Sequence, residues 1–317
     1  MHDTRTTLRA EILLLLLLPF GLCWALGCEE DTQKQIQLPI GAAQGITGDW
    51  EETGYEEWQG AVGLRIGNKR CSGTLIHPRV VITAAHCVWD KTSSPQSIVV
   101  FGGADPSSHE DFASGEEVIV HPWFNHSVVN AANVDIAMVK LASDVTQAEP
   151  FPVRQEPAPE VEETGMLVGY GYIAHNANTT WGVHRAGETA VLELVSECLE
   201  LGGEVGFCRG DSGGPFFTQQ KDQWVLTGVS SWTLYIDACY PGYGNYSVNL
   251  VQHRDWIAET YESMTGEPLP DVEEIDTDTE VQDDAGVGGD GGDNSGCGIA
   301  PASSGRSLLG VLLRGAF

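Results

Sequence analysis

The strongest constraint on this chain is the hexapeptide Gly210–Pro215, which reads Gly-Asp-Ser-Gly-Gly-Pro. Glycine tolerates backbone conformations that other residues avoid, so a serine flanked by glycines can lie on a tight turn with its hydroxyl exposed. In such a turn the N–H groups of Gly210 and Ser212 can point together at one spot and hold an oxyanion there. The hexapeptide therefore predicts a turn that presents Ser212 as a nucleophile.

A serine hydroxyl becomes a good nucleophile only when a base takes its proton, and imidazole is suited because it titrates near neutral pH. The candidate base is His86, in the sequence Thr-Ala-Ala-His-Cys. Asp135 begins the apolar run Asp-Ile-Ala-Met-Val-Lys-Leu, so we expect its carboxylate to be buried beside the imidazole. The order along the chain is His, Asp, Ser, which differs from subtilisin and from the α/β-hydrolases.

These three motifs, in this order and spacing, resemble the chymotrypsin/trypsin family of serine endopeptidases over roughly residues 46–261. The resemblance implies an all-β fold, with two antiparallel six-stranded β-barrels and a C-terminal helix within residues 46–264. It also implies peptide-bond hydrolysis through an acyl-enzyme, protein or peptide substrates, a monomer and no cofactor or metal. The alternative is a surface binding module that uses a protease fold with weak or no activity.

Short runs rich in β-branched residues, separated by Gly, Asn and Pro, agree with that fold. The runs expected to form the first barrel are 61–66, 73–76, 80–83, 98–101, 118–121 and 136–141. Those expected in the second are 166–172, 191–194, 215–217, 224–232 and 246–249, before a helix over 254–261. A calcium site needs six or more converging oxygens, so we expect the following acids to lie in a solvated loop instead: Glu110, Asp111, Glu116 and Glu117.

The family register also predicts the pocket for the substrate residue before the scissile bond, the S1 pocket. Its expected floor and walls are Gly206, Phe207, Ser231, Trp232, Thr233 and Gly244. Gly206 carries no carboxylate, so a trypsin-like preference for Arg or Lys is not expected. Thr233 and Phe207 narrow the space, which favours small or medium apolar side chains.

Activation by cleavage is a further implication of the resemblance. Ile46-Thr47-Gly48-Asp49 is similar to the new N-terminus of the family, with Asp49 in place of a usual glycine, and Ile40 is an alternative start. A freed α-ammonium would be buried against Asp211, because a buried carboxylate needs a partner. Residues 28–45 would then be a propeptide.

The eight cysteines favour disulfides in a chain that is expected to be exported. The resemblance pairs Cys71 with Cys87 and Cys208 with Cys239, and it provides no partner for Cys198, which we expect to be a buried free thiol. No spacing typical of a zinc site is present. The remaining histidines are expected to be surface or packing residues.

The two ends of the chain predict export. Residues 1–27 read as a signal peptide, followed by Cys28 in a sequence that resembles a bacterial lipobox. Residues 265–296 are expected to be an acidic, Gly-rich disordered linker. Residues 297–317 resemble a MYXO-CTERM surface-sorting tail, with Cys297 as a second lipidation candidate. The alternative to the lipobox is an ordinary signal peptide, and the alternative to the sorting tail is a disordered end. The net charge of −29 argues against nucleic acid as a partner. The protein is therefore expected to be secreted or anchored at the cell surface.

Overall fold

The structure is a computed structural model that describes residues 47–48, 55–172, 181–234, 239 and 242–272. The chain divides into two compact units, 1–274 and 275–317, and all described residues belong to the first. The predicted signal peptide, propeptide, most of the acidic linker and the sorting tail lie outside the described residues. Within the described part, no helix has both the length and the apolar character needed to cross a bilayer.

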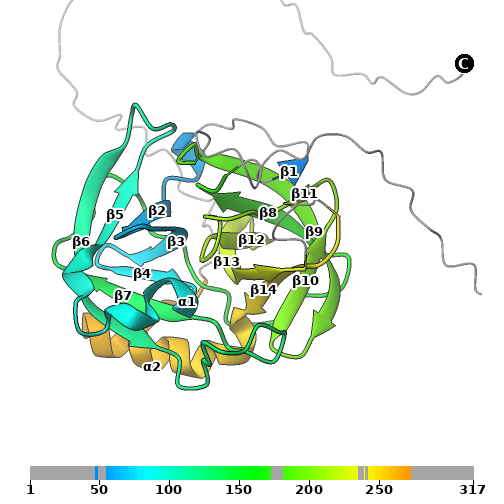
Figure 1. Ribbon diagram of the computed structural model, residues 1–317. Helices are drawn as coiled ribbons and strands as arrows, with labels where there is room; N and C mark the ends of the chain where they lie inside the picture. The colour runs from blue at the N-terminus through cyan, green and yellow to red at the C-terminus, as the bar shows by residue number, and fades with distance from the viewer. Residues whose placement is uncertain (1–46, 49–54, 173–180, 235–238, 240–241, 273–317) are drawn as a thin grey trace, which may run out of the picture. The chain divides into compact units, whose positions relative to one another are not determined.

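The first half of the chain forms a closed antiparallel barrel in the order β2-β3-β4-β7-β6-β5 (Figure 1). All six predicted runs are found as strands, because alternating or continuous apolar residues place one or both faces in the core. Val80–Thr83, for example, is buried throughout. The strands are β2 (Ala61–Ile66), β3 (Lys69–His77), β4 (Val80–Thr83), β5 (Ile98–Gly102), β6 (Glu110–Val120) and β7 (Ala137–Leu141).

The second half forms another closed antiparallel barrel, in the order β10-β14-β13-β12-β8-β9. It lies beside the first in Figure 1, where it is drawn in green to yellow. The two-barrel prediction is therefore confirmed. The strands are β8 (Thr164–Gly169), β9 (Arg185–Val195), β10 (Cys198–Gly202), β12 (Pro215–Gln220), β13 (Gln223–Thr233) and β14 (Asn245–Asn249).

Two local predictions were wrong. The acids expected in a loop, Glu110, Asp111, Glu116 and Glu117, lie in β6, which begins well before the predicted residue 118. Their side chains are exposed, whereas Ala113, Gly115 and Val118 are buried. The segment is a strand because it pairs with β5 on one side and β7 on the other. Strand β10 was missed altogether. Its apolar residues are only Leu199 and Leu201 beside Cys198, and pairing with β9 and β14 makes it a strand.

Smaller elements complete the described part. A two-stranded sheet joins β1 (Thr47–Gly48) to β11 (Val205–Gly206). The predicted closing helix is present as α2 (Arg254–Thr265), drawn in orange in Figure 1, and it extends four residues beyond the predicted end. The short helices are η1 (Tyr55–Glu57), α1 (Ala85–Val88), η2 (Trp89–Lys91), η3 (Pro95–Ser97) and η4 (Leu250–His253).

An aromatic cluster packs where the two halves of the chain meet. Trp58, only 1% exposed, stacks on Phe217 of β12 with ring centroids 5.3 Å apart and also contacts Trp224 of β13. Phe151, from the connection between the barrels, packs on Phe217 at 4.3 Å. Burial of such large rings fixes the second barrel against the residues just before the first one.

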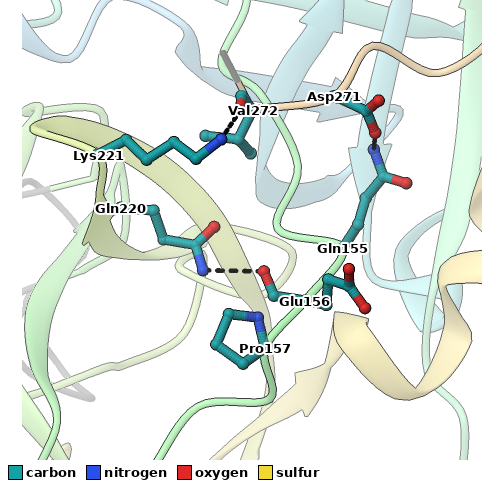
Figure 2. A pocket seen from close by; sticks show the side chains of 7 residues that line it. All are labelled: Gln155, Glu156, Pro157, Gln220, Lys221, Asp271 and Val272. Atoms are coloured by element: carbon teal, nitrogen blue, oxygen red, sulfur yellow. Dashed lines mark hydrogen bonds between the residues drawn. The ribbon is translucent and has the colours of Figure 1, made fainter. Parts of the chain in front are cut away.

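The chain after α2 returns to the connection between the barrels (Figure 2). The Gln155 amide donates to the carbonyl of Pro270 at 3.0 Å, and Lys221 Nζ donates to the carbonyl of Val272 at 2.9 Å. These contacts border a polar cavity of about 630 Å³ that is lined by none of the predicted site residues. They fix the position at which the C-terminal extension begins.

Candidate active site

His86 and Asp135 are in direct contact. His86 lies on the one-turn helix α1 just after β4, and Asp135 lies two residues before β7, which pairs with β4. The ring Nδ1 of His86 is 2.6 Å from Asp135 Oδ2, and the backbone N–H of His86 donates to Asp135 Oδ1 at 2.7 Å. The carboxylate is 5% exposed, whereas the imidazole side chain is 40% exposed. One buried carboxylate thus holds both the ring and the backbone of a histidine that still faces solvent.

Ser231 supplies a third hydrogen bond to the same carboxylate. Its hydroxyl donates to Asp135 Oδ2 at 2.6 Å, from β13 of the second barrel. The sequence predicted Ser231 only as a wall of the S1 pocket. The bond ties the carboxylate of one barrel to a strand of the other.

The pKa of His86 is raised above its ordinary value of 6.5. Burial is the largest influence and opposes the charged ring, but the charge and hydrogen bond of Asp135 together outweigh it. Lys69 also opposes protonation through its positive charge. The ring is therefore a stronger base than a free imidazole.

The loop that carries Ser212 is fixed by backbone hydrogen bonds to both barrels. The N–H of Ser72 in β3 donates to the Ser212 carbonyl at 2.8 Å, and the N–H of Gly213 donates to the carbonyl of Ser230 at 2.7 Å. Gly210 has a φ of +92° and Gly213 one of +84°, a region in which L side chains are strained. The loop therefore needs glycine at both positions.

Ser212 and His86 line one cavity of about 340 Å³. No hydrogen bond joins the serine hydroxyl to the ring in the described part of the chain, and such pairs are often loose before substrate binds. Apolar side chains, those of Phe124, Val128 and Trp232 among them, also line this cavity. The full lining is His86, Phe124, His126, Val128, Val129, Asn133, Asp135, Ser212, Ser231, Trp232 and Thr233.

The backbone beside Ser212 offers two unused donors. Among the described residues, the N–H groups of Gly210 and Ser212 make no hydrogen bond, whereas the N–H groups of Asp211, Gly213 and Gly214 all do. The carbonyl of Gly210 accepts from the Ser72 hydroxyl at 2.9 Å. This bond turns the Gly210 carbonyl toward β3 and fixes the orientation of the peptide between Gly210 and Asp211.

Asp211 is buried beneath this loop and is 1% exposed. One carboxylate oxygen accepts from the N–H of Gly171 at 2.7 Å and the other from the N–H of Cys208 at 2.9 Å. The Arg185 guanidinium, which is also buried, donates to the carbonyl of Gly171 at 3.1 Å. Ile46 lies outside the described residues, but Thr47 beside it pairs with Gly206.

Three of the six residues predicted for the S1 pocket line the cavity that contains His86, and Gly206, Phe207 and Gly244 do not. Ser231, Trp232 and Thr233 line the cavity that contains His86. Phe207 is 3% exposed and packs in the core cluster of the second barrel, so its ring does not narrow that cavity. The N–H of Gly244 donates to Glu200 at 2.9 Å, which places a half-buried carboxylate next to a predicted pocket wall.

The predicted disulfides, Cys71–Cys87 and Cys208–Cys239, are both present, with Cα atoms 6.4 and 4.7 Å apart. Cys198 is a buried free thiol, as expected. The sulfurs of Cys71 and Cys87 and a ring nitrogen of His86 lie within 4.8 Å of one another. Because the two sulfurs are bonded to each other, they provide no thiolate for a metal.

Comparison with known proteins agrees with this architecture. The family model described as Trypsin matches residues 46–257, which is more than half of the chain. The chain belongs to the trypsin family. It is a serine endopeptidase, whose substrates are proteins or peptides.

Two curated relatives share this trypsin-family region. A tryptase of Mus musculus is 29% identical over 251 residues, which cover 69% of this chain and 89% of the relative. The CLIP domain-containing serine protease B15 of Anopheles gambiae is 29% identical over 254 residues, covering 66% of this chain and 67% of the relative.

Several polar residues of this trypsin-family site were not predicted from the sequence. Ser72 bridges two backbone segments, since its hydroxyl donates to Gly210 and accepts from the N–H of Tyr170 at 3.1 Å. Arg185 and Glu200 were missed too. A serine before a glycine, or an arginine at the start of a strand, carries no signal of its own, and only the pairing of distant segments gives these residues a role.

Proposed function

We propose that Ser212, His86 and Asp135 are the catalytic triad of this endopeptidase. The observation that carries the proposal is the contact between the His86 ring and the buried Asp135 carboxylate, on the wall of the cavity that Ser212 also lines. The carboxylate would hold the Nδ1–H tautomer, which leaves Nε2 free to take the serine proton.

In this mechanism the Ser212 oxygen attacks the substrate carbonyl as its proton moves to His86 Nε2. The carbonyl oxygen becomes an oxyanion, which the N–H groups of Gly210 and Ser212 stabilise. His86 then gives its proton to the leaving amine, and an ester remains on Ser212. A water, deprotonated by His86, cleaves that ester and regenerates the enzyme.

The experiment is covalent labelling with a fluorophosphonate probe together with hydrolysis of a peptide library. We expect the probe to label Ser212, and Ser212→Ala to abolish both labelling and turnover without a change in melting temperature. Ser107→Ala, at an exposed serine, is the matched control and should behave like the wild type. Absence of labelling in the mature protein would favour the non-catalytic binding module.

Activation by cleavage before Ile46 belongs to the same proposal. The pairing of Thr47 with Gly206 brings the segment after Ile46 close to Cys208, whose N–H is bound to Asp211. A new α-ammonium there could pair with the Asp211 carboxylate and order the Gly210 peptide. N-terminal sequencing of the mature enzyme should find Ile46; a mature form that begins at Ile40 or Cys28 would contradict this.

The proposed preference before the scissile bond is for small or medium apolar side chains. Support comes from the absence of a charge at Gly206 and from the apolar lining by Phe124, Val128 and Trp232. A library profile dominated by Arg or Lys would overturn the preference and would direct attention to the Glu200 carboxylate beside Gly244. Export with a lipid anchor, at Cys28 of the uncleaved precursor or at Cys297, and a monomeric state remain part of the proposal, to be checked by mass spectrometry of the precursor and of the mature chain.

A further inference from the structure

Two adjacent cations, Lys69 and Arg70, begin strand β3 beside the candidate active site. The whole chain has only 16 Lys and Arg against 45 Asp and Glu, so a pair at this place is a local exception. Ser72, two residues further along β3, donates its N–H to the Ser212 carbonyl at 2.8 Å. The start of β3 therefore borders the serine loop.

Arg70 is connected to Gly210 through the ring of Trp181. Alternate residues of a strand share a face, so Arg70 lies on the same face as Ser72, whose hydroxyl bonds to the Gly210 carbonyl. The Arg70 guanidinium stacks over the Trp181 ring, 4.8 Å from its centroid. Trp181 in turn packs on Gly210, because a Cβ atom on that glycine would lie 3.2 Å from Trp181 Cδ1.

Lys69 lies on the histidine side of the same rim. Its Nζ is 3.1 Å from Asp90 Oδ1, on the short helix that follows His86 and Cys87. Its positive charge opposes protonation of His86, although Asp135 outweighs it and the pKa of His86 is raised. Lys69 and Arg70 therefore flank the space between the imidazole and Gly210.

This rim keeps a net positive charge. Arg70 Nη1 donates to the carbonyls of Gly67 and Lys69, at 2.9 and 3.0 Å, and no carboxylate pairs with it among the residues that the structure describes. Asp90 is the partner of Lys69 and also of Lys91, so one carboxylate is shared by two ammonium groups. A half-buried guanidinium on an aromatic face is preorganised for a carboxylate.

The rim lies where the leaving half of a substrate must pass. The amine that departs has to be within reach of His86, which protonates it. The other half of the substrate would lie along Ser231 and Thr233, which line the apolar cavity that does not include Arg70 or Trp181. We infer that Lys69 and Arg70 select peptides with Asp or Glu in the first three positions after the scissile bond.

The inference rests on the proposed function and is tested with pairs of internally quenched peptides. The peptides share one sequence before the scissile bond and differ by Glu or Gln at the first, second or third position after it. At low salt we expect kcat/KM to be about two- to fivefold higher for the Glu peptide than for the Gln peptide at one of these positions, as for a partly exposed ion pair. This Glu/Gln ratio should fall in about 0.5 M salt, because salt at that concentration screens such pairs.

Three variants separate the roles. Arg70→Gln should lower kcat/KM for the Glu peptides more than for the neutral peptides, so that the Glu/Gln ratio falls toward 1, and Arg70→Lys should keep part of the ratio because it keeps the charge. Arg254→Gln removes an exposed charge on helix α2 and is the control, expected to leave the ratio unchanged.

The outcomes distinguish the two claims. A ratio of 1 at all three positions in the wild type, or a ratio that Arg70→Gln leaves unchanged, would overturn the inference, whereas hydrolysis of the neutral peptide would still uphold the proposed function. Failure of the wild type to hydrolyse any peptide or to react with the fluorophosphonate would overturn both.

Discussion

Gly210→Ala tests whether the backbone donor beside Ser212 is as tightly determined as the structure indicates. Gly210 has a φ of +92°, and an added Cβ would lie 3.0 Å from Gly171 Cα and 3.2 Å from Trp181 Cδ1. The unfavourable φ costs about 1 to 3 kcal/mol, and the crowding can be relieved only if the loop moves. Displacement of one oxyanion donor costs about 2.7 to 4 kcal/mol in the barrier, which corresponds to a roughly 10²- to 10³-fold loss in kcat.

The assay is steady-state hydrolysis of a neutral peptide, with active sites counted by the fluorophosphonate probe. We expect kcat to fall by the amount above with KM nearly unchanged, because the donor acts on the transition state. Gly266→Ala is the matched control: Gly266 ends α2 at a φ of +81° with no atom within 4 Å of the added Cβ, so only stability should suffer. A Gly210→Ala enzyme within threefold of wild-type kcat, roughly 0.7 kcal/mol, would refute the reasoning.

Three further predictions concern ionisation. The acid limb of kcat/KM should have its midpoint above pH 6.5, since the pKa of His86 is raised and the base must be neutral to accept a proton; a pH–rate profile with a lower midpoint would contradict this. Burial lowers the pKa of His184 to about 4, so the unfolded chain binds the proton more readily and stability should fall as the pH drops from 6.5 to about 4, by at most about 3 kcal/mol. His184→Phe should make this pH dependence less steep in thermal unfolding, and the part that remains is expected from His121 and His253, whose pKa values burial also lowers to about 4. Burial, together with the nearby Asp135 and Glu197 charges, raises the pKa of the Cys198 thiol to about 12. At neutral pH the thiol should therefore react with a thiol reagent only after the protein unfolds, as measured by mass spectrometry of the peptide that contains Cys198. Rapid labelling of the native enzyme would argue against the buried position of Cys198.

Strands with strong local patterns could be predicted from the sequence, and strands that depend on their neighbours could not. Ala61–Ile66 and Val80–Thr83 were predicted with their observed bounds, because apolar and β-branched residues follow one another between turn residues. Four of the eleven residues of β6 are acidic, and β10 is only five residues long. Both become strands because a closed barrel needs a hydrogen-bonded neighbour on each side of every strand. Those neighbours, β5 and β7 for β6 and β9 and β14 for β10, come from other parts of the chain.

The sequence by itself determined the chemical groups of the candidate site and the family, because Ser212, His86 and Asp135 stand in motifs whose residue types serve that chemistry. The resemblance that these motifs carry also implied the two cysteine pairs that the structure contains. The tertiary structure alone decided that Ser231 donates to Asp135, that Phe207 packs in the barrel core, and that Arg70 stacks over Trp181 beside Gly210. The reason is physical: these contacts join residues far apart in the chain, and only closure of both barrels brings them within the few ångströms over which hydrogen bonds, packing and cation–π attraction act.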